Sequence, residues 1–294
     1  MSPRPLAHLS MLLFAAFIAG SFTTGALAVP HLAPAPLNAV RFILAALLMG
    51  TVAFGLARQP FALPRSPWRF GITGFLTAIY FVTMFVALTM TQPVATSAVY
   101  TLVPIMTAVT AYFLVGQRSG AAVLLSLLLA GMGAIWVIFR GDLDALLRFD
   151  IGAGELIYFV GCVAYAIYTP LLRKFQRGEP ALVLSFWTLT ATALWITAYG
   201  LPEMLAVDWL HLPAVVWWVL LYLAVAPTAI CFFLIQFASR HLPAAKVIAY
   251  GYLTPAFVIV FEGLAGHGWT TLSVVIGAGV TVLGLAVLAL VPDR

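Results

Sequence analysis

The sequence predicts an all-α membrane protein of ten transmembrane helices, arranged as two inverted five-helix repeats with both termini in the cytoplasm. Its 294 residues are 64% hydrophobic and only 8% charged, and a soluble chain of this length cannot bury so much apolar surface. Ten apolar segments each reach the length of about 20 residues that crosses a hydrocarbon core of about 30 Å. A sequence pattern that recurs in the two halves is the third observation.

Short connections join the ten expected helices, and the longest of them, 140–151 and 201–213, have about a dozen residues each. They leave no room for a soluble domain or a nucleotide-binding loop, which excludes ATP hydrolysis by this chain. The helices are expected at approximately residues 9–29, 36–57, 68–90, 93–115, 120–139, 152–173, 180–200, 214–237, 243–264 and 270–291.

The first expected helix shares features with a cleavable secretory signal, namely Arg4, an apolar stretch and the tripeptide ALA at 26–28. Cleavage there would leave the first repeat one helix short, so we expect residues 9–29 to remain as a helix. Cys162 and Cys231 fall inside expected helices, where they are expected to be small apolar side chains without a disulfide framework.

Basic residues are distributed unequally between the two sides of the expected bundle. With a cytoplasmic N-terminus, the outer connections hold only Arg140 and Arg148, both close to aspartates. The inner connections and termini hold ten basic residues: Arg4, Arg58, Arg65, Arg69, Arg118, Arg173, Lys174, Arg177, Arg240 and Arg294. Cytoplasmic connections of membrane proteins carry such an excess of Lys and Arg, so both termini are expected to be cytoplasmic.

The repeated pattern relates residues 87–117 to residues 238–267. It pairs "ALTMTQPVATSAVYTLVPIMTAVTAYFLVGQ" with "ASRHLPAAKVIAYGYLTPAFVIVFEGLAGH", in which Ala87 and Ala238 each precede a mid-helix proline by 17 residues. We expect residues 1–145 to form the first repeat and residues 146–294 the second. Each repeat has five helices, an odd number, so the two halves must have opposite orientations in the membrane.

Three prolines fall near the middle of expected helices: Pro104, Pro255 and Pro227. A proline inside a helix lacks an N–H group and leaves a carbonyl one turn earlier without its partner. Lipid cannot satisfy that carbonyl, so such breaks face protein or a water-filled cavity. We expect the three prolines to mark helix breaks that line a central cavity.

The segment "PLNAVRF" at 36–42, and the order of alanine, proline and a glycine-polar pair in residues 87–117 and 238–267, resemble the drug/metabolite transporter superfamily in its ten-span EamA-type branch. That branch usually has glutamate after the last glycine, whereas this chain has Gln117 and His267. Within the branch, the overall pattern and the tyrosines are most similar to YddG-type exporters of aromatic amino acids. The resemblance implies a central cavity walled by helices 1, 3, 4, 6, 8 and 9, with helices 5 and 10 peripheral.

Aromatic side chains near mid-depth are the candidate ring-binding residues, because a phenolic hydroxyl deep in hydrocarbon needs a partner and therefore points inward. They are Tyr80, Tyr100, Tyr165, Tyr250, Tyr252 and Trp187. For each tyrosine alone, a packing role between helices is the alternative.

Two basic residues, Lys246 and Arg41, fall inside expected helices. We expect Lys246 to be the donor for a substrate carboxylate, because it is the cation nearest the break at Pro255, and we take Arg41 as the second choice. The alternatives are that Lys246 extends to the inner surface, and that Arg41 extends to the outer interface or forms a structural ion pair.

No acidic residue falls at the centre of an expected helix, since Glu155 and Glu262 lie near outer helix ends. An exporter of cationic drugs would be expected to bury a carboxylate there. The chain also lacks a serine elbow with histidine, zinc-spaced histidines and paired carboxylates, so we expect neither an enzyme nor a cofactor or metal site.

These features predict a secondary transporter of the bacterial inner membrane that exports small zwitterionic metabolites, with aromatic amino acids as the first expectation, by alternating access. The alternatives are a carrier of purines, sugars or amphiphilic drugs, and a passive channel-like pore. The expected partners are the lipid bilayer and a small solute, with no nucleic acid. Transport direction, proton coupling and oligomeric state stay open from the sequence.

Overall fold

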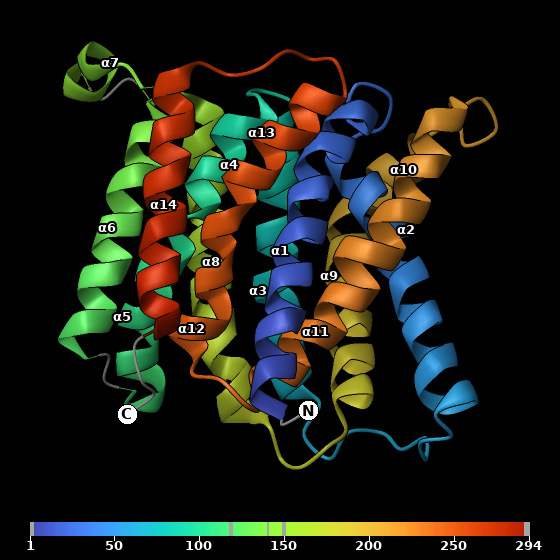
Figure 1. The fold of residues 1–294 in the computed structure, drawn as a ribbon. Coiled ribbons are helices and arrows are strands. Elements are labelled where there is room, and N and C mark those ends of the chain that lie inside the picture. The colour runs from blue at the N-terminus through green and yellow to red at the C-terminus, as the bar shows by residue number, and fades with distance from the viewer. Residues whose placement is uncertain (1–2, 118–119, 140, 149–150, 291–294) are drawn as a thin grey trace.

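The computed structural model describes residues 3–117, 120–139, 141–148 and 151–290, and within these ranges all ten expected segments are helical (Figure 1). Six of them are uninterrupted: α1 (Pro3–Ala28), α3 (Trp68–Leu88), α6 (Ala121–Ile138), α8 (Ala153–Phe175), α9 (Ala181–Ala206) and α14 (Leu272–Leu290). Eight spans among the described residues are long and apolar enough to cross a membrane, and Ala121–Val137 and Leu272–Val287 are shorter apolar helices.

The other four segments are divided into shorter helices, either by a turn or by a change of helix type. They are α2 (Pro34–Gly50) with η1 (Thr51–Leu56), α4 (Pro93–Tyr100) with α5 (Val103–Val115), α10 (Ala214–Ala224) with η2 (Val225–Ile230) and α11 (Cys231–Ala238), and α12 (Ala244–Ala249) with η3 (Tyr250–Leu253) and α13 (Thr254–Leu264). The 140–151 connection contains one short helix, α7 (Leu143–Arg148), which the sequence did not predict. The expected repeat boundary between residues 145 and 146 falls inside α7 and stays a prediction.

The three mid-helix prolines lie at the breaks. Pro104 and Pro255 occupy the first turns of α5 and α13, where a missing N–H group costs nothing. A turn separates α4 from α5, and the 3₁₀-helix η3 separates α12 from α13. Pro227 lies in the π-helix η2, a form that occurs mostly as short bulges and often at functional sites. The helices are interrupted just before Pro104 and Pro255, the helix type changes at Pro227, and all three prolines are buried. Their expected role in lining a central cavity stays a prediction.

The packing of the helices follows the internal repeat. α3 packs against α8, and the equivalent helices α11 and α1 pack against each other; α4 packs against α13 as α12 packs against α5. α1 begins on the side of the bundle where α14 ends, whereas α8, the equivalent of α1, begins beside α7 on the opposite side (Figure 1). The two halves therefore have opposite directions through the bundle.

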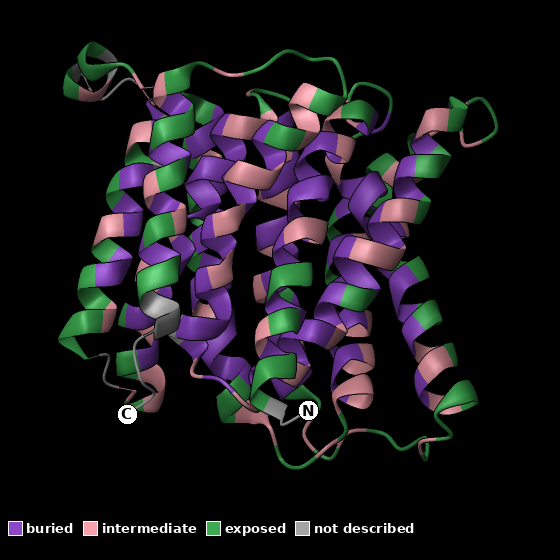
Figure 2. Ribbon diagram, viewed as in Figure 1, coloured by how far each residue is buried: buried purple, intermediate pink, exposed green. Residues whose placement is uncertain are grey.

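The helices α6 and α14 pack against each other at the left side of the bundle in Figure 1, and α2 and α9 form a second packed pair. Burial is concentrated in the central helices, while exposed residues cover the outward faces (Figure 2). The exposed large side chains are mostly apolar, among them Phe113, Leu125, Leu194, Trp218 and Leu283. These faces are exposed to lipid in a membrane protein, where apolar side chains are the stable choice.

The first helix is part of the core. α1 packs against α13, α11 and α10, and it buries Met11, Phe14, Ile18 and Phe22. The expectation that residues 9–29 form a helix of the bundle is confirmed. Cys162 and Cys231 are also buried and free, as expected.

Candidate functional site

Six buried rings from four helices meet at the centre of the bundle, and we name them the aromatic cluster: Phe22 on α1, Tyr80 on α3, Tyr100 on α4, and Tyr158, Tyr165 and Tyr168 on α8. The rings of Tyr80 and Tyr165 are stacked, with centroids 4.4 Å apart. The ring of Tyr100 lies 6.1 Å from each of them. Phe22 contacts the rings of Tyr100 and Tyr158.

The sequence of α8 explains how three tyrosines reach one site. Residues 158, 165 and 168 follow the spacing of one helix face, and that face packs against α3. Gly161 lies on the same side, where a Cβ atom would come within 3.2 Å of the backbone of Tyr80. The missing side chain therefore lets α3 and α8 approach closely enough for Tyr80 and Tyr165 to stack.

The hydroxyl groups of the cluster are only partly hydrogen-bonded. The Tyr158 hydroxyl donates to the Tyr80 hydroxyl at 2.9 Å. The hydroxyls of Tyr100 and Tyr168 are buried and have no hydrogen-bond partner in the structure. Because leaving such a group unsatisfied costs about 1–3 kcal/mol, these two hydroxyls are candidate contacts for a polar group of a bound solute.

Arg41 on α2 is fully buried, with 0% of its surface exposed. Its Nε atom donates to Thr228 Oγ1 at 2.6 Å, and the Thr228 hydroxyl donates to the Leu223 carbonyl at 2.6 Å. That carbonyl lies four residues before Pro227, which has no N–H group to offer it. Thr228 therefore takes over the carbonyl, and its oxygen remains free to accept the hydrogen bond from Arg41.

The rest of the Arg41 guanidinium lies among rings. Its central carbon is 4.6 Å from the centroid of Phe81 and 5.4 Å from that of Phe85, distances that allow cation–π attraction. The Nη1 atom reaches only a long contact of 3.5 Å to Asn38, and Nη2 is buried without a hydrogen-bond partner. No ion pair among the described residues includes Arg41.

The ring of Phe81 connects this cation to the aromatic cluster, because it lies 4.8 Å from the ring of Tyr80. The alternatives in which Arg41 extends to the outer interface or forms an ion pair are therefore wrong. The reason is packing: the part of α2 that carries Arg41 faces η2 inside the bundle, and the side chain has no route to the surface.

The structure does not bring the other expected residues to the cluster. The Tyr250 hydroxyl is hydrogen-bonded to His8 Nδ1 at 2.7 Å, and the Tyr252 hydroxyl donates to the Leu127 carbonyl on α6 at 3.2 Å. Tyr250 and Tyr252 lie in the 3₁₀-helix η3, where side chains two residues apart point about 120° from each other, so these tyrosines diverge toward α1 and α6. Trp187 packs against Phe61 and Phe186 at the outer face of α9.

Lys246 on α12 is also buried, with 7% of its surface exposed. Its role as a carboxylate donor stays a prediction. Sequence reasoning did not select five residues of the site: Phe22, Phe81, Tyr158, Tyr168 and Thr228. The helical spacing of Tyr168 from Tyr165 was a usable signal, whereas nothing in the sequence pointed to Thr228 as the partner of Arg41.

Glu179 organises the end of the bundle at which α1 begins. Arg69 Nη2 donates to Glu179 Oε1 at 2.7 Å, the backbone N–H of Arg177 donates to Oε2 at 2.8 Å, and Arg240 donates to the Glu179 carbonyl. Partial burial acts to raise the pKa of Glu179, but the hydrogen bonds from Arg69 and from backbone N–H groups lower it below its ordinary value. We call these four residues the Glu179 network; it ties together α3, the 176–180 connection and the end of α11.

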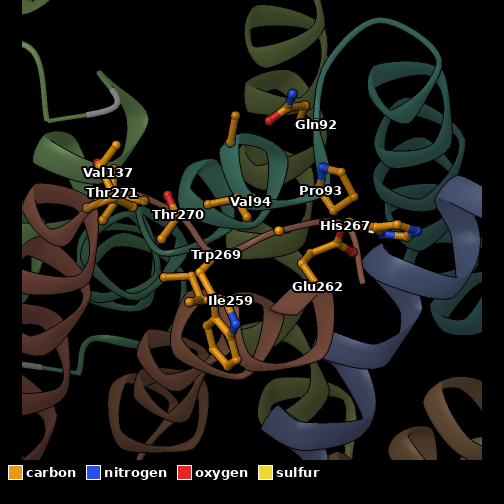
Figure 3. Close-up of a pocket in the computed structure, with 13 residues that line it drawn as sticks. Gln92, Pro93, Val94, Val137, Ile259, Glu262, His267, Trp269, Thr270 and Thr271 are labelled. Carbon is orange, nitrogen blue, oxygen red and sulfur yellow. Dashed lines mark hydrogen bonds and ion pairs between the residues drawn. The ribbon is translucent and has the colours of Figure 1, made fainter. Parts of the chain in front are cut away.

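A pocket of about 430 Å³ lies at the opposite end of the bundle (Figure 3). The start of α4, the end of α13 and the 267–271 connection line it, with Gln92, Glu262, His267 and Trp269 among its residues. His267 Nδ1 lies 2.8 Å from Glu262 Oε2. As expected, this carboxylate is near a helix end. Among the described residues no group of three or more His, Cys, Asp or Glu side chains could hold a metal ion.

Comparison with known proteins agrees with this architecture. A curated relative, "Uncharacterized transporter YyaM" from Bacillus subtilis (strain 168), is 24% identical over 282 residues, which cover 95% of this chain and 92% of the relative. A solved crystal structure superposes with a TM-score of 0.74 at 20% identity, covering 99% of this chain and 98% of the other, and so shares the fold.

The profile of one family matches the chain twice, once in each half, at residues 5–139 and 152–290, and the family is described as the EamA-like transporter family. Its members are transporters and not enzymes. The two matches correspond to the two halves that the packing relates, and together they cover most of the sequence. The chain is therefore a multi-pass membrane transporter that belongs to the EamA-like transporter family.

Proposed function

We propose that this transporter carries small solutes that combine a carboxylate with an aromatic ring, in the first place zwitterionic aromatic amino acids, and exports them by alternating access. The observation that carries the proposal is the Arg41 guanidinium, a buried cation whose Nη2 atom lacks a partner beside a cluster of buried rings. A buried cation without a counter-charge is costly. This position therefore favours the binding of an anionic group that belongs to a solute.

Each part of such a solute has a matching group. The planar fork of an arginine binds a carboxylate through two parallel hydrogen bonds, and Nη1 and Nη2 of Arg41 are the atoms with spare donor capacity. The stacked rings of Tyr80 and Tyr165 offer faces and edges to a solute ring. The hydroxyl oxygens of Tyr100 and Tyr168 are acceptors for an ammonium group. Lys246 remains the second candidate for the carboxylate.

The inverted halves supply the transport cycle. Alternating access in such folds comes from one half moving against the other around a site near mid-membrane. The helix breaks between α4 and α5 and at η3 lie at equivalent positions in the two halves, and each provides a point where a segment bends. The Glu179 network lies at the end of the bundle that we expect to face the cytoplasm, and the pocket of Figure 3 lies at the other end.

The test is uptake and counterflow in proteoliposomes that contain the purified full-length chain. A panel of aromatic amino acids, the matching amines that lack the carboxylate, purines and sugars is offered to the wild type and to Arg41→Gln. We expect saturable transport of the amino acids with trans-stimulation, which a passive pore does not show. Arg41→Gln should lower amino-acid affinity roughly 10- to 150-fold, the equivalent of one charge-assisted contact, and should affect the amines much less.

Two results would contradict the proposal. Transport of amines or sugars in preference to amino acids by the wild type would assign another substrate class. Equal loss of amino-acid and amine transport in Arg41→Gln, with correct membrane insertion, would make Arg41 a structural residue.

A further inference from the structure

A groove follows the seam between α3 and α9 on the lipid-facing surface of the bundle, separate from the aromatic cluster. It consists of two chambers of about 610 Å³ and about 450 Å³. Trp195 and Ala198 line both chambers, so the two adjoin along the seam. The larger one, which we name the lower chamber, extends to Leu63 and Pro67 at the start of α3.

Small residues on both helices create the groove. At Gly74, a Cβ atom would lie 2.7 Å from the carbonyl carbon of Ala191, so the two helices touch backbone to backbone at this level. The side chains on the lipid side of the contact diverge and leave a depression. The Trp195 indole N–H donates to the Gly71 carbonyl at 2.9 Å, which fixes the ring across the seam as the partition between the chambers.

The lower chamber has the dimensions and chemistry of an acyl-chain site. Its walls are apolar, with Phe70, Trp187 and Leu194 among them. From residue 187 to residue 198 the axis of α9 rises about 16 Å, which is about half of a hydrocarbon core of about 30 Å. The chamber therefore has the depth of one leaflet, and in a bilayer the surrounding molecules that can fill it are lipid chains.

The end of the lower chamber nearest the membrane surface is basic. Arg65 is exposed and lies between Pro64 and Pro67, which line the chamber. Next to it, Ser66 Oγ accepts a hydrogen bond from the exposed Arg177 at 2.9 Å. The nearby carboxylate of Glu179 is already bound to Arg69. Arg65 and Arg177 thus present positive charge where the headgroup of a lipid in the chamber would lie.

Trp68 marks the level of this surface. Its ring is exposed and packs against Phe175 at the end of α8, an arrangement typical of indoles at the boundary between headgroups and hydrocarbon. The basic end of the chamber is therefore at headgroup depth, with the apolar walls directly beneath it.

We propose that the lower chamber is a binding site for an anionic phospholipid, with one acyl chain lying against α9 and the phosphate held by Arg65 and Arg177. The site is independent of the transported solute. It predicts selectivity for the headgroup charge, which an ordinary lipid-facing surface lacks.

The proposal is tested by native mass spectrometry of the full-length protein after exchange into an equimolar mixture of phosphatidylglycerol and phosphatidylcholine. The wild type should retain phosphatidylglycerol in preference. Arg65→Gln should reduce that preference about fivefold, because one basic residue near an anionic headgroup contributes about 1 kcal/mol. Arg58→Gln, which removes an exposed arginine of the same connection, is the matched control and should retain the wild-type preference.

A second pair of variants tests the chamber itself. Ala198→Phe places a ring at the junction of the two chambers and should abolish retention of the lipid, whereas Ala286→Phe on the exposed face of α14 should leave it unchanged. Equal retention of the two lipids by the wild type, or equal effects within either matched pair in folded protein, would overturn the proposal.

Discussion

Tyr100 and Gly251 occupy equivalent positions in the two halves of the chain, each four residues before a break proline, and they contact each other. A Cβ atom on Gly251 would lie 2.8 Å from Cε1 of the Tyr100 ring. Two equivalent residues in contact place the pseudo-twofold axis between them. The axis therefore passes beside the aromatic cluster, where a carrier of two inverted halves holds its substrate.

Gly251→Ala should consequently disturb the centre of the protein. The added methyl group overlaps the Tyr100 ring, and such overpacking costs about 1–3 kcal/mol. We expect a lower thermal denaturation midpoint and slower transport, and the midpoint should be partly restored by the smaller side chain in the double variant Gly251→Ala with Tyr100→Leu. Gly279→Ala is the control, because a Cβ atom there meets nothing within 4 Å. Equal effects at the two glycines would contradict this prediction.

The same symmetry supplies a control for the Arg41 site. The contact between α2 and η2, Arg41 Nε to Thr228 Oγ1 at 2.6 Å, corresponds to a contact between the related helices α9 and α3, Thr192 Oγ1 to Thr77 Oγ1 at 2.7 Å. One contact contains a cation and the other only hydroxyl groups. Equivalent substitutions in the two contacts therefore separate the effect of positioning Arg41 from a general loss of a helix–helix hydrogen bond.

Thr228→Val should raise the KM for a carboxylate solute several-fold, because it removes the acceptor that orients Arg41, and Thr228→Ser should restore it. Thr77→Val should lower stability by about 0.5–1.5 kcal/mol, the usual contribution of one hydrogen bond, with little change in KM. Transport kinetics and thermal denaturation of the three variants check this. A KM shift of similar size in Thr77→Val would show that Thr228 does not act through Arg41.

The Glu179 network should make the stability of the protein depend on pH. Because the pKa of Glu179 is lowered from an ordinary value of 4.5, its contribution is present above that value and is lost as the pH falls through the lower, folded-state pKa. The denaturation midpoint of Glu179→Gln should therefore lie below that of the wild type at pH 7, and the difference should shrink in acid. A difference that stays constant down to the lowest pH would contradict the role of the ionised carboxylate.

Transport of a neutral zwitterion should need no imposed pH gradient. We expect no carboxylate near the middle of a span, because Glu155 and Glu262 lie near helix ends. Glu155 accepts a hydrogen bond from Thr91 at 2.7 Å, and Glu262 is paired with His267. Glu155→Gln and Glu262→Gln should keep most of the counterflow activity in proteoliposomes. Complete loss in either variant, with normal insertion, would identify a proton-coupling residue.

The orientation in the membrane is tested by reporter fusions. An enzyme reporter that is active only in the periplasm should be silent after residue 294 and active when inserted within residues 140–150. This follows from the excess of basic residues in the connections assigned to the cytoplasm. Periplasmic activity of the C-terminal fusion would reverse the assignment, and with it the side on which the Glu179 network lies.

The sequence by itself determined the all-helical membrane fold, the ten helices, the two halves and the breaks at Pro104 and Pro255. These features follow from local chemistry: the length of apolar segments, the missing N–H of proline and the odd number of helices in each half. The resemblance to EamA-type transporters, based on the same residues, is confirmed by the family match in both halves.

Only the tertiary structure decided which mid-membrane polar side chains meet. Periodicity says which face of a helix a residue occupies but not which neighbour that face contacts, so Tyr80, Tyr100 and Tyr165 converge while Tyr250 and Tyr252 diverge. Arg41 became the central cation because the π-helix at Pro227 presents Thr228 to it. That contact joins residues 187 positions apart, and only the packing of α2 against η2 could place them together.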